Sequence, residues 1–492
     1  MKIELDYNRP ADYDLFLKIK SLPVYSFTGR TAEFPDEYAN RIGVKPARKL
    51  VLKYEPIAGL FDYQRDISRL AIRKEKFAAF VKPGYGKTLI GAEFCRHAIS
   101  QIRKRECVLW VSPSMVVKQT VQEIERFYGK DAAPQIVKAA DLPAWLDKGG
   151  KFGITNFEAI RDDLPTWRIA AIAIDESSIM KSHYGAWGER LIEMGRGKRF
   201  KLCLTGTPAP NDRIEYANHA VFLDRFPTVN SFLARYFVNR GQTGERWELK
   251  PHALKAFYRD LSDWSIFLSD PSVYGWKDNT ETIPPLSVEV LDVEMTPGQI
   301  AAVQAETGDL FGHPGGITSR AKLARIAKGI GEGGTTNKPA FIRDLVNQWP
   351  DRSTIIWCKY NPEQDGMAAM FPNCANIDGR TPDEKREILI DEFKAGTRKE
   401  LISKPKILGL GLNLQVCTRM VFSTCQDSYE EFVQALYRAN RVGSTEPLKA
   451  YIPVTPVERP MMQNVLRKAK MVEQDTREQE LLFRANGYDF GA

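Results

Sequence analysis

Short, continuously apolar segments recur along the chain and alternate with longer amphipathic stretches. Between about residues 60 and 210 these segments are FAAFV (77–81), CVLWV (107–111), FGIT (152–155), IAAIAI (169–174) and FKLCL (200–204). A strand covered by helices on both faces of a parallel sheet has this continuously apolar pattern, whereas a half-exposed strand alternates. Strands that alternate with helices predict an α/β fold built on a parallel sheet.

The same pattern returns after residue 350. The apolar segments there are STIIWC (353–358), ANID (375–378), ELIS (400–403), RMVFST (419–424) and KAYIPV (449–454). A chain of 492 residues is too long for one hydrophobic core of ordinary size. The sequence therefore predicts two α/β domains in tandem.

The segments around these patterns set the predicted domain boundaries. Residues 1–54 are expected to form a small N-terminal accessory module, and residues 55–282 the first domain, with a helical, aromatic-rich insertion near 212–280. Two prolines after Ile283 mark a linker, because proline disfavours helix in the residue before it. The second domain is then 283–456, and the charged segment 457–492 predicts a C-terminal helical brace.

Composition excludes several classes of protein. The chain has 70 Lys and Arg against 62 Asp and Glu, a net charge of +8 that is compatible with a polyanionic partner. No apolar stretch approaches membrane-spanning length, and the seven cysteines form no CxxC pair. We therefore expect a soluble, monomeric, cytoplasmic protein with reduced thiols and no membrane partner.

Residues 81–88, VKPGYGKT, follow the first apolar segment and have the composition of a phosphate-binding loop. The candidate nucleotide ligands are Pro83, Gly84, Tyr85, Gly86, Lys87 and Thr88. Glycines let backbone N–H groups approach phosphate oxygens, the lysine reaches the terminal phosphates, and the threonine hydroxyl holds Mg²⁺. The full pattern has a further glycine where this chain has Val81, so a plain glycine turn with an exposed lysine is the alternative.

Two carboxylates, Asp175 and Glu176, follow the segment IAAIAI. At the carboxyl end of a buried strand, Asp175 can hold Mg²⁺, and Glu176 can orient or deprotonate the attacking water. The alternative is an acidic surface turn. Thr205 to Pro208 follow another strand and could sense the phosphate state, or could form a solvated turn.

The second half of the chain offers arginines for the same chemistry. If one helix carries Gln434, Arg438 and Arg441, their spacing of four and three residues places them on one face. Two arginines there usually form surface salt bridges. The alternative that we favour is an arginine finger, which neutralises charge on the transferred phosphoryl group. The finger would require the two domains to close on one nucleotide.

In this order, the motifs resemble those of superfamily-two helicases and translocases of the Swi/Snf-type group, over about residues 55–475. The matching segments are FDYQR (61–65), GYGKT (84–88), WVSPS (110–114), IDESSIMKS (174–182), LTGTPAPN (204–211), IDGRTPDEKREILIDEFKAG (377–396), ISKPKILGLGLNLQVCTRMVFS (402–423) and QALYRANRVGSTEPLKAYIPVT (434–455). The sequence departs from the group at Ser177-Ser178, where Gly-His is usual, and this variant is similar to phage-encoded members, which would place the protein in the host cytoplasm.

The resemblance implies two RecA-like domains that use ATP and Mg²⁺. It implies that Gln64 reads the adenine, that Gly411 and Gln434 also contact the nucleotide, and that Lys87, Asp175, Glu176, Arg438 and Arg441 are catalytic. The residues implied to contact DNA are Ser112, Pro113, Thr205, Lys404 and Asn413. Segment 16–39 is loosely similar to the substrate-recognition module of annealing helicases, or else it caps the first domain.

The resemblance predicts an ATP-dependent DNA translocase that acts in branch migration or fork remodelling. Its partner would be duplex, forked or branched DNA rather than RNA, tracked by the basic segments 196–201, 320–328 and 398–406. A strand-tracking helicase and an ATP-gated loading protein that does not translocate are the alternatives. A nuclease is disfavoured because no dense His, Asp and Glu cluster is visible.

Overall fold

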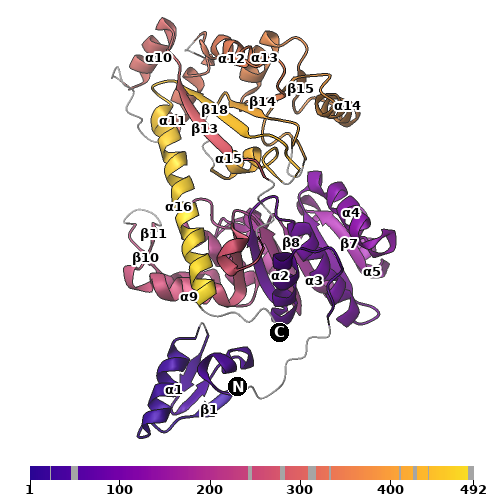
Figure 1. Cartoon of the computed structure of the whole chain (residues 1–492), viewed down its shortest axis with the longest axis vertical. Helices are drawn as coiled ribbons and strands as arrows, with labels where there is room; N and C mark the ends of the chain where they lie inside the picture. The colour runs from indigo at the N-terminus through magenta and orange to yellow at the C-terminus, as the bar shows by residue number, and fades with distance from the viewer. Residues whose placement is uncertain are drawn as a thin grey trace. The chain divides into compact units, whose positions relative to one another are not determined.

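The computed structural model divides into two compact units. Unit 1 is Met1–Asp278 with Glu473–Ala492, and unit 2 is Asn279–Val472. Figure 1 shows the elements of each. The structure describes residues 1–22, 24–45, 54–241, 246–277, 283–307, 317–331, 334–408, 412–424, 429–441 and 443–485.

Unit 1 is built on a seven-stranded parallel sheet with the strand order β12-β4-β9-β8-β5-β7-β6. Its strands are β4 (Lys76–Val81), β5 (Cys107–Ser112), β6 (Gln135–Ile136), β7 (Phe152–Asn156), β8 (Ile169–Asp175), β9 (Phe200–Thr205) and β12 (Ser265–Leu268). All five apolar segments of the first half are strands, which confirms the prediction. They are buried on both faces, as their continuous apolar pattern requires.

Helices cover both faces of this sheet. One hydrophobic core packs α2 (Asp62–Lys74), α3 (Lys87–Gln101) and α4 (Ser114–Tyr128) against one face, and Figure 1 shows α2 and α3 side by side there. The second core includes residues of α5 (Leu142–Lys148), α6 (Ala186–Gly195), α7 (Ala217–Phe222), α8 (Val229–Tyr236) and α9 (Leu254–Trp264). The sheet is therefore the middle layer of three.

The segment near 212–280, predicted as a helical, aromatic-rich insertion, contains strands as well as helices. Helices α7, α8 and α9 lie there, but β10 (Phe237–Asn239) and β11 (Trp247–Leu249) form an antiparallel pair, and β12 joins the main sheet beside β4. Strand β12 has the sequence SIFL, a short apolar segment of the kind that marks the other strands. Because many aromatic residues surround this segment, its short apolar pattern did not stand out as a strand.

Unit 2 contains a six-stranded parallel sheet with the order β13-β18-β17-β14-β16-β15. Its strands are β13 (Leu286–Asp292), β14 (Thr354–Trp357), β15 (Ala375–Ile377), β16 (Glu400–Ser403), β17 (Arg419–Phe422) and β18 (Leu448–Val454). The five apolar segments of the second half are confirmed as strands. Strand β13 was not predicted, because it is an edge strand whose exposed residues break the continuous apolar pattern.

Helices also cover both faces of the second sheet. One core packs α12 (Lys338–Val346) and α13 (Asn361–Met370) against it, and another packs α14 (Asp383–Lys394) and α15 (Tyr429–Leu436). Helices α10 (Pro297–Thr307) and α11 (Ile317–Ile326) form a smaller core with Val457. The fold is thus two tandem α/β units with parallel sheets, as predicted.

The N-terminal residues form a small module of unit 1. Strands β1 (Lys2–Glu4), β3 (Thr31–Glu33) and β2 (Ser26–Thr28) make an antiparallel sheet, accompanied by α1 (Pro10–Lys20). Tyr38 donates a hydrogen bond to the buried carboxylate of Asp263 on α9. Asp263 also pairs with Lys74 at 2.7 Å and Arg225 at 2.8 Å, so the module contacts the first α/β fold through a buried polar cluster.

The long helix α16 (Arg459–Ala485) follows β18, in agreement with a helical C-terminal segment. It is shared between the units, because unit 2 ends at Val472 and Glu473 belongs to unit 1. Among the described residues, no helix combines the length and the apolar character needed to span a bilayer.

Candidate nucleotide-binding site

The glycine-rich loop lies between the end of β4 and the start of α3. Gly84 has φ of 94° and Gly86 has φ of 71°, a left-handed region that favours glycine. Helix α3 begins at Lys87, so its first backbone N–H groups and its positive dipole end lie at the loop. Such a helix start suits a phosphate group.

Gln64, near the start of α2, is buried and bonded to this loop. The backbone N–H of Phe61 donates to Gln64 Oε1 at 3.0 Å, and Gln64 Nε2 donates to the carbonyl oxygen of Tyr85 at 3.2 Å. A β-carbon added to Gly86 would lie 2.2 Å from Gln64 Nε2. Glycine at this position therefore permits both the loop conformation and its contact with Gln64.

The acidic pair lies at the carboxyl end of β8, near the lysine of the loop. Lys87 Nζ is 3.5 Å from Glu176 Oε1, and Asp175 Oδ1 accepts a hydrogen bond from the Glu176 N–H at 3.0 Å. Glu176 has φ of 48°, an uncommon conformation for a residue other than glycine. Backbone strain of this kind concentrates at functional sites. The structure thus brings together loop and acidic residues that are 88 positions apart or more.

Asp175 is a buried carboxyl group whose negative charge is only partly offset by its neighbours. Burial and the neighbouring Glu176 carboxylate raise the pKa of Asp175 to about 7, and the Lys87 ammonium only partly opposes them. A divalent cation here would favour the ionised carboxylate. Mg²⁺ is usually held by one or two carboxylates together with waters and phosphate oxygens. Asp175, with the half-buried Thr88 at the start of α3, fits such an ion.

Two of the predicted DNA contacts lie inside this network. Ser112 and Thr205 are fully buried: the Ser112 hydroxyl donates to Asp175 Oδ2 at 3.4 Å, and the Thr205 hydroxyl donates to Glu176 Oε2 at 3.4 Å. Both hydroxyls thus contact the acidic pair in this structure, and their contact with DNA stays a prediction. Each of the two residues ends a strand, where its side chain turns toward the acidic pair. Thr205 also accepts the N–H of Thr207 at 3.2 Å.

The other predicted DNA contacts are less buried. Pro113 is half-buried at the start of α4, Lys404 donates a hydrogen bond to the side-chain oxygen of Asn361, and Asn413 is exposed. Gly411, predicted to contact the nucleotide, lies outside the described residues. Contact with DNA or nucleotide by these residues stays a prediction.

The prediction that Gln434, Arg438 and Arg441 share one helical face is wrong, because α15 ends at Leu436. Arg438 lies in the turn that follows, where its carbonyl oxygen accepts the N–H of Leu414 at 3.0 Å. Its side chain is 5% exposed, and Nη1 donates to the Leu408 carbonyl oxygen at 3.4 Å. In this turn the backbone N–H groups of Arg438 and Ala439 donate to carbonyl oxygens three residues earlier, at 3.4 and 3.3 Å, rather than four residues earlier as in an α-helix.

Two lysines that were assigned to basic, DNA-facing segments are instead buried. Lys201 donates to the carbonyl oxygen of Phe222 and pairs with Asp224, each at 2.8 Å. Lys328 is 5% exposed and pairs with Glu458. Charge counting along the sequence cannot separate such buried ion pairs from a solvated basic surface.

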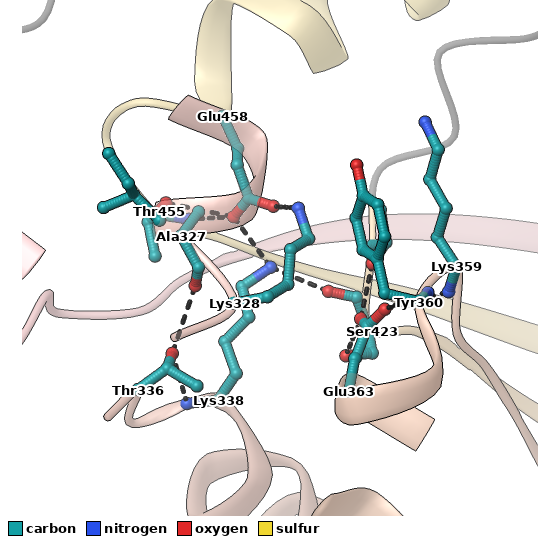
Figure 2. Close-up of polar contacts among 12 residues, drawn as sticks. Ala327, Lys328, Thr336, Lys338, Lys359, Tyr360, Glu363, Ser423, Thr455 and Glu458 are labelled. Carbon is teal, nitrogen blue, oxygen red and sulfur yellow. Dashed lines mark hydrogen bonds and ion pairs between the residues drawn. The ribbon is translucent and has the colours of Figure 1, made fainter. Parts of the chain in front are cut away.

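Glu458 belongs to a buried polar cluster at the carboxyl ends of the unit 2 strands (Figure 2). It pairs with Lys328 and, at 2.7 Å, with Lys338, whose Nζ also donates to the Ser423 carbonyl oxygen at 2.7 Å. Burial alone would raise the pKa of Glu458, but the two lysines lower it to about 2. The sequence analysis missed this cluster, since its members are far apart in the chain.

The same cluster holds the residues that directly follow β17 in place. Glu363 accepts the hydroxyls of Ser423, at 2.7 Å, and of Thr424, and the N–H groups of Lys359 and Tyr360 at 2.8 and 3.2 Å. The chain then continues toward the helix and turn that carry Gln434 and Arg438. Within the described ranges, no group of three or more His, Cys, Asp and Glu residues forms a candidate metal site.

Comparisons with known proteins show similarity of this chain to helicases. A family model described as the helicase conserved C-terminal domain matches residues 337–443. The mouse protein "DNA annealing helicase and endonuclease ZRANB3" is 22% identical over 421 residues, which cover 78% of this chain and 37% of that protein. "Putative protein p41" of Acyrthosiphon pisum secondary endosymbiont phage 1 is 23% identical over 312 residues, which cover 58% of this chain and 65% of that protein.

One solved structure, the Sulfolobus solfataricus SWI2/SNF2 ATPase core in complex with dsDNA, has 17% sequence identity and a TM-score of 0.40, covering 88% of this chain and 97% of that one. The present chain spans less than two thirds of the length of the mouse and phage relatives. The helicase model and these relatives support the resemblance of the chain to superfamily-two helicases of the Swi/Snf-like group, and one of the relatives is encoded by a phage.

Proposed function

We propose that this protein is a DNA-dependent ATPase that translocates along DNA. The observation that carries the proposal is the arrangement of Lys87 and Glu176, 3.5 Å apart, beside the glycine-rich loop and the buried Asp175. A loop for phosphate, a carboxylate for the cation and a second carboxylate for water are the parts that phosphoryl transfer to water requires. The resemblance to the Swi/Snf-like group and the printed name of the mouse relative, a DNA annealing helicase, support DNA as the polymer.

Each side chain has a distinct role in this proposal. Lys87 and the N–H groups at the start of α3 would bind the terminal phosphates, while Asp175 and Thr88 would hold Mg²⁺, whose charge would offset that of the phosphates. Glu176 orients the attacking water and accepts its proton. The Thr205 hydroxyl contacts Glu176, so the segment after β9 can respond when that carboxylate changes partners.

Arg438 and Arg441 are the proposed arginine fingers. They belong to unit 2, whereas the loop and the acidic pair belong to unit 1. A requirement for both units would couple hydrolysis to domain closure, which is how we propose that the protein, as a monomer, steps along DNA. The finger acts mainly on the transition state, so its loss should affect turnover more than nucleotide affinity.

We further propose that the natural substrate is duplex, forked or branched DNA, used in branch migration or fork remodelling. The printed name of the mouse relative, a DNA annealing helicase, favours this over simple unwinding. The alternative of a strand-tracking helicase rests on the same motifs. A comparison of forked duplexes with mobile four-way junctions in a strand-displacement assay separates these two uses.

The central experiment measures the ATPase rate with single-stranded, duplex, forked and four-way DNA, together with displacement of a triplex-forming strand. We expect stimulation by DNA and triplex displacement that depends on ATP. The Lys87→Ala variant should lose both while it retains DNA binding, because the phosphate loop and the DNA contacts are separate. DNA-independent hydrolysis without triplex displacement would contradict translocation and support an ATP-gated loading protein.

A further inference from the structure

The phosphate loop has a contact that its nucleotide-binding role does not require. Tyr85, between the two glycines, is 6% exposed, and its hydroxyl donates to the carbonyl oxygen of Ser269 at 3.0 Å. Ser269 directly follows β12, which pairs with β4, and the N–H of Lys82 donates to the Leu268 carbonyl oxygen at 2.9 Å. The loop is therefore fastened to the end of β12 at two points.

Ser269 is in turn held by the C-terminal helix. Glu480 of α16 is 1% exposed and accepts three hydrogen bonds: from the Ser269 N–H, from the Ser269 hydroxyl at 3.0 Å, and from the Asp270 N–H at 3.3 Å. Phe483, one turn further along α16, packs edge-on against Tyr274 with ring centroids 5.7 Å apart. Helix α16 thus packs against the segment that contains Ser269, the residue to which the phosphate loop is hydrogen-bonded through Tyr85.

A buried carboxylate is costly unless its charge is compensated. Burial raises the pKa of Glu480, and the hydrogen bonds from Ser269 and Asp270 only partly oppose this shift. A neutral residue with the same shape would be less costly at this position. The carboxylate of Glu480 nevertheless accepts hydrogen bonds from both the N–H and the hydroxyl of Ser269, which fixes the position of the Ser269 backbone.

We propose that Glu480 is a positioning residue for the nucleotide site, which acts through Ser269 and Tyr85 to hold the phosphate loop in its binding conformation. The proposal rests on the proposed function as an ATPase. Helix α16 starts in unit 2 and ends in unit 1, so the residue that positions the loop is carried on a segment shared by both units. Through these contacts the C-terminal helix contributes to nucleotide affinity.

The test is a double-mutant cycle with Tyr85→Phe and Glu480→Gln, read as the dissociation constant of a fluorescent ATP analogue with Mg²⁺. Tyr85→Phe removes only the hydroxyl, and Glu480→Gln removes one acceptor oxygen. Each should weaken nucleotide binding about threefold to tenfold, the effect of one hydrogen bond. Because both side chains act through Ser269, their effects should not add. The double variant should bind the nucleotide with about the same affinity as the single variant that binds it more weakly. For Glu480→Gln, the rate at saturating ATP should stay within about twofold of the parent.

Asp475→Asn provides the matched control. Asp475 lies on the same helix and pairs with Arg213 at 2.6 Å, so this change loosens α16 at a different point. It should leave nucleotide affinity within about twofold, and its effect should multiply with that of Tyr85→Phe, as expected for independent sites. If Glu480→Gln does not fold, Ser269→Ala removes the hydroxyl contact with Glu480 and should shift affinity in the same direction.

Unchanged affinity in Glu480→Gln, or effects of Tyr85→Phe and Glu480→Gln that simply multiply, would overturn the positioning role. Equal weakening by Asp475→Asn would do the same, because any loosening of the helix would then suffice. These results are distinct from a failure of the proposed function. That failure would appear as turnover retained in Lys87→Ala, or as a parent protein that binds no ATP.

Discussion

Replacement of Asp175 by asparagine should stabilise the nucleotide-free protein while it abolishes ATP hydrolysis. Burial and Glu176 raise the pKa of Asp175 from 3.8 to about 7. The native state therefore holds this proton more tightly than the unfolded state, and ionisation destabilises the fold as the pH rises from 4 to 7. A shift of roughly three pKa units corresponds to an upper limit of about 4 kcal/mol. The amide cannot reproduce every hydrogen bond of the carboxylate, so we expect about half of that value.

The assay is urea unfolding of the parent and Asp175→Asn proteins without Mg²⁺, at several pH values between 4 and 8. The difference in unfolding free energy should favour the variant at pH 8 and shrink toward pH 4, where the parent carboxyl is already protonated. A difference that is independent of pH, or that favours the parent at pH 8, would refute this reasoning. Turnover should be undetectable in the variant at every pH.

A second buried aspartate provides a control of opposite sign. Burial opposes ionisation of Asp263, but Lys74 and Arg225 lower its pKa to about 2. This carboxylate therefore stabilises the fold above pH 4, and its contribution is lost as the pH falls toward 2. Asp263→Asn should destabilise the protein by about 3 to 5 kcal/mol at pH 8, because two cations lose their partner.

Three further variants test other parts of the structure. Gly86→Ala should weaken ATP binding at least about tenfold in a titration, because its β-carbon would meet Gln64 and its φ of 71° disfavours alanine; unchanged affinity would show that the loop rearranges. Arg441→Ala should bind ATP normally but lose DNA-stimulated turnover, and hydrolysis at the parental rate would remove the finger assignment. Glu458→Gln should lower the unfolding free energy by about 3 to 5 kcal/mol, since two buried lysines lose their counter-ion, and an unchanged urea midpoint would argue against that pairing.

The central strands of both sheets could be predicted because a strand buried on two faces must be apolar along its whole length. Edge strands escape this rule: β13 exposes most of its residues, and β12 is only four residues long. The positions of the glycine loop and the acidic pair were also predictable. Both directly follow buried apolar strands, and a tight turn of this kind requires glycine. Where a helix ends depends on distant contacts, so the placement of Arg438 outside α15 was not predictable.

Burial of charged residues was likewise hidden from the sequence. In the sequence, Lys201 and Lys328 cannot be told apart from exposed lysines. Only the structure shows that they are buried, where they pair with Asp224 and Glu458. The contacts of Ser112 and Thr205 with the acidic pair were hidden for a related reason, because a strand end can face either the solvent or the neighbouring strand end.

The sequence by itself determined the two parallel sheets, the order of the motifs and the glycine-rich loop that we propose binds a nucleotide, because hydrophobic periodicity and the composition of such a loop are local properties. Only the tertiary structure decided that Lys87 meets Glu176, that Glu363 and Glu458 organise the strand ends of unit 2, and that Glu480 contacts the anchor of the phosphate loop. Such contacts join residues separated by tens to hundreds of positions. Their formation depends on how the packed elements bring backbone and charge together, which no local pattern of residues records.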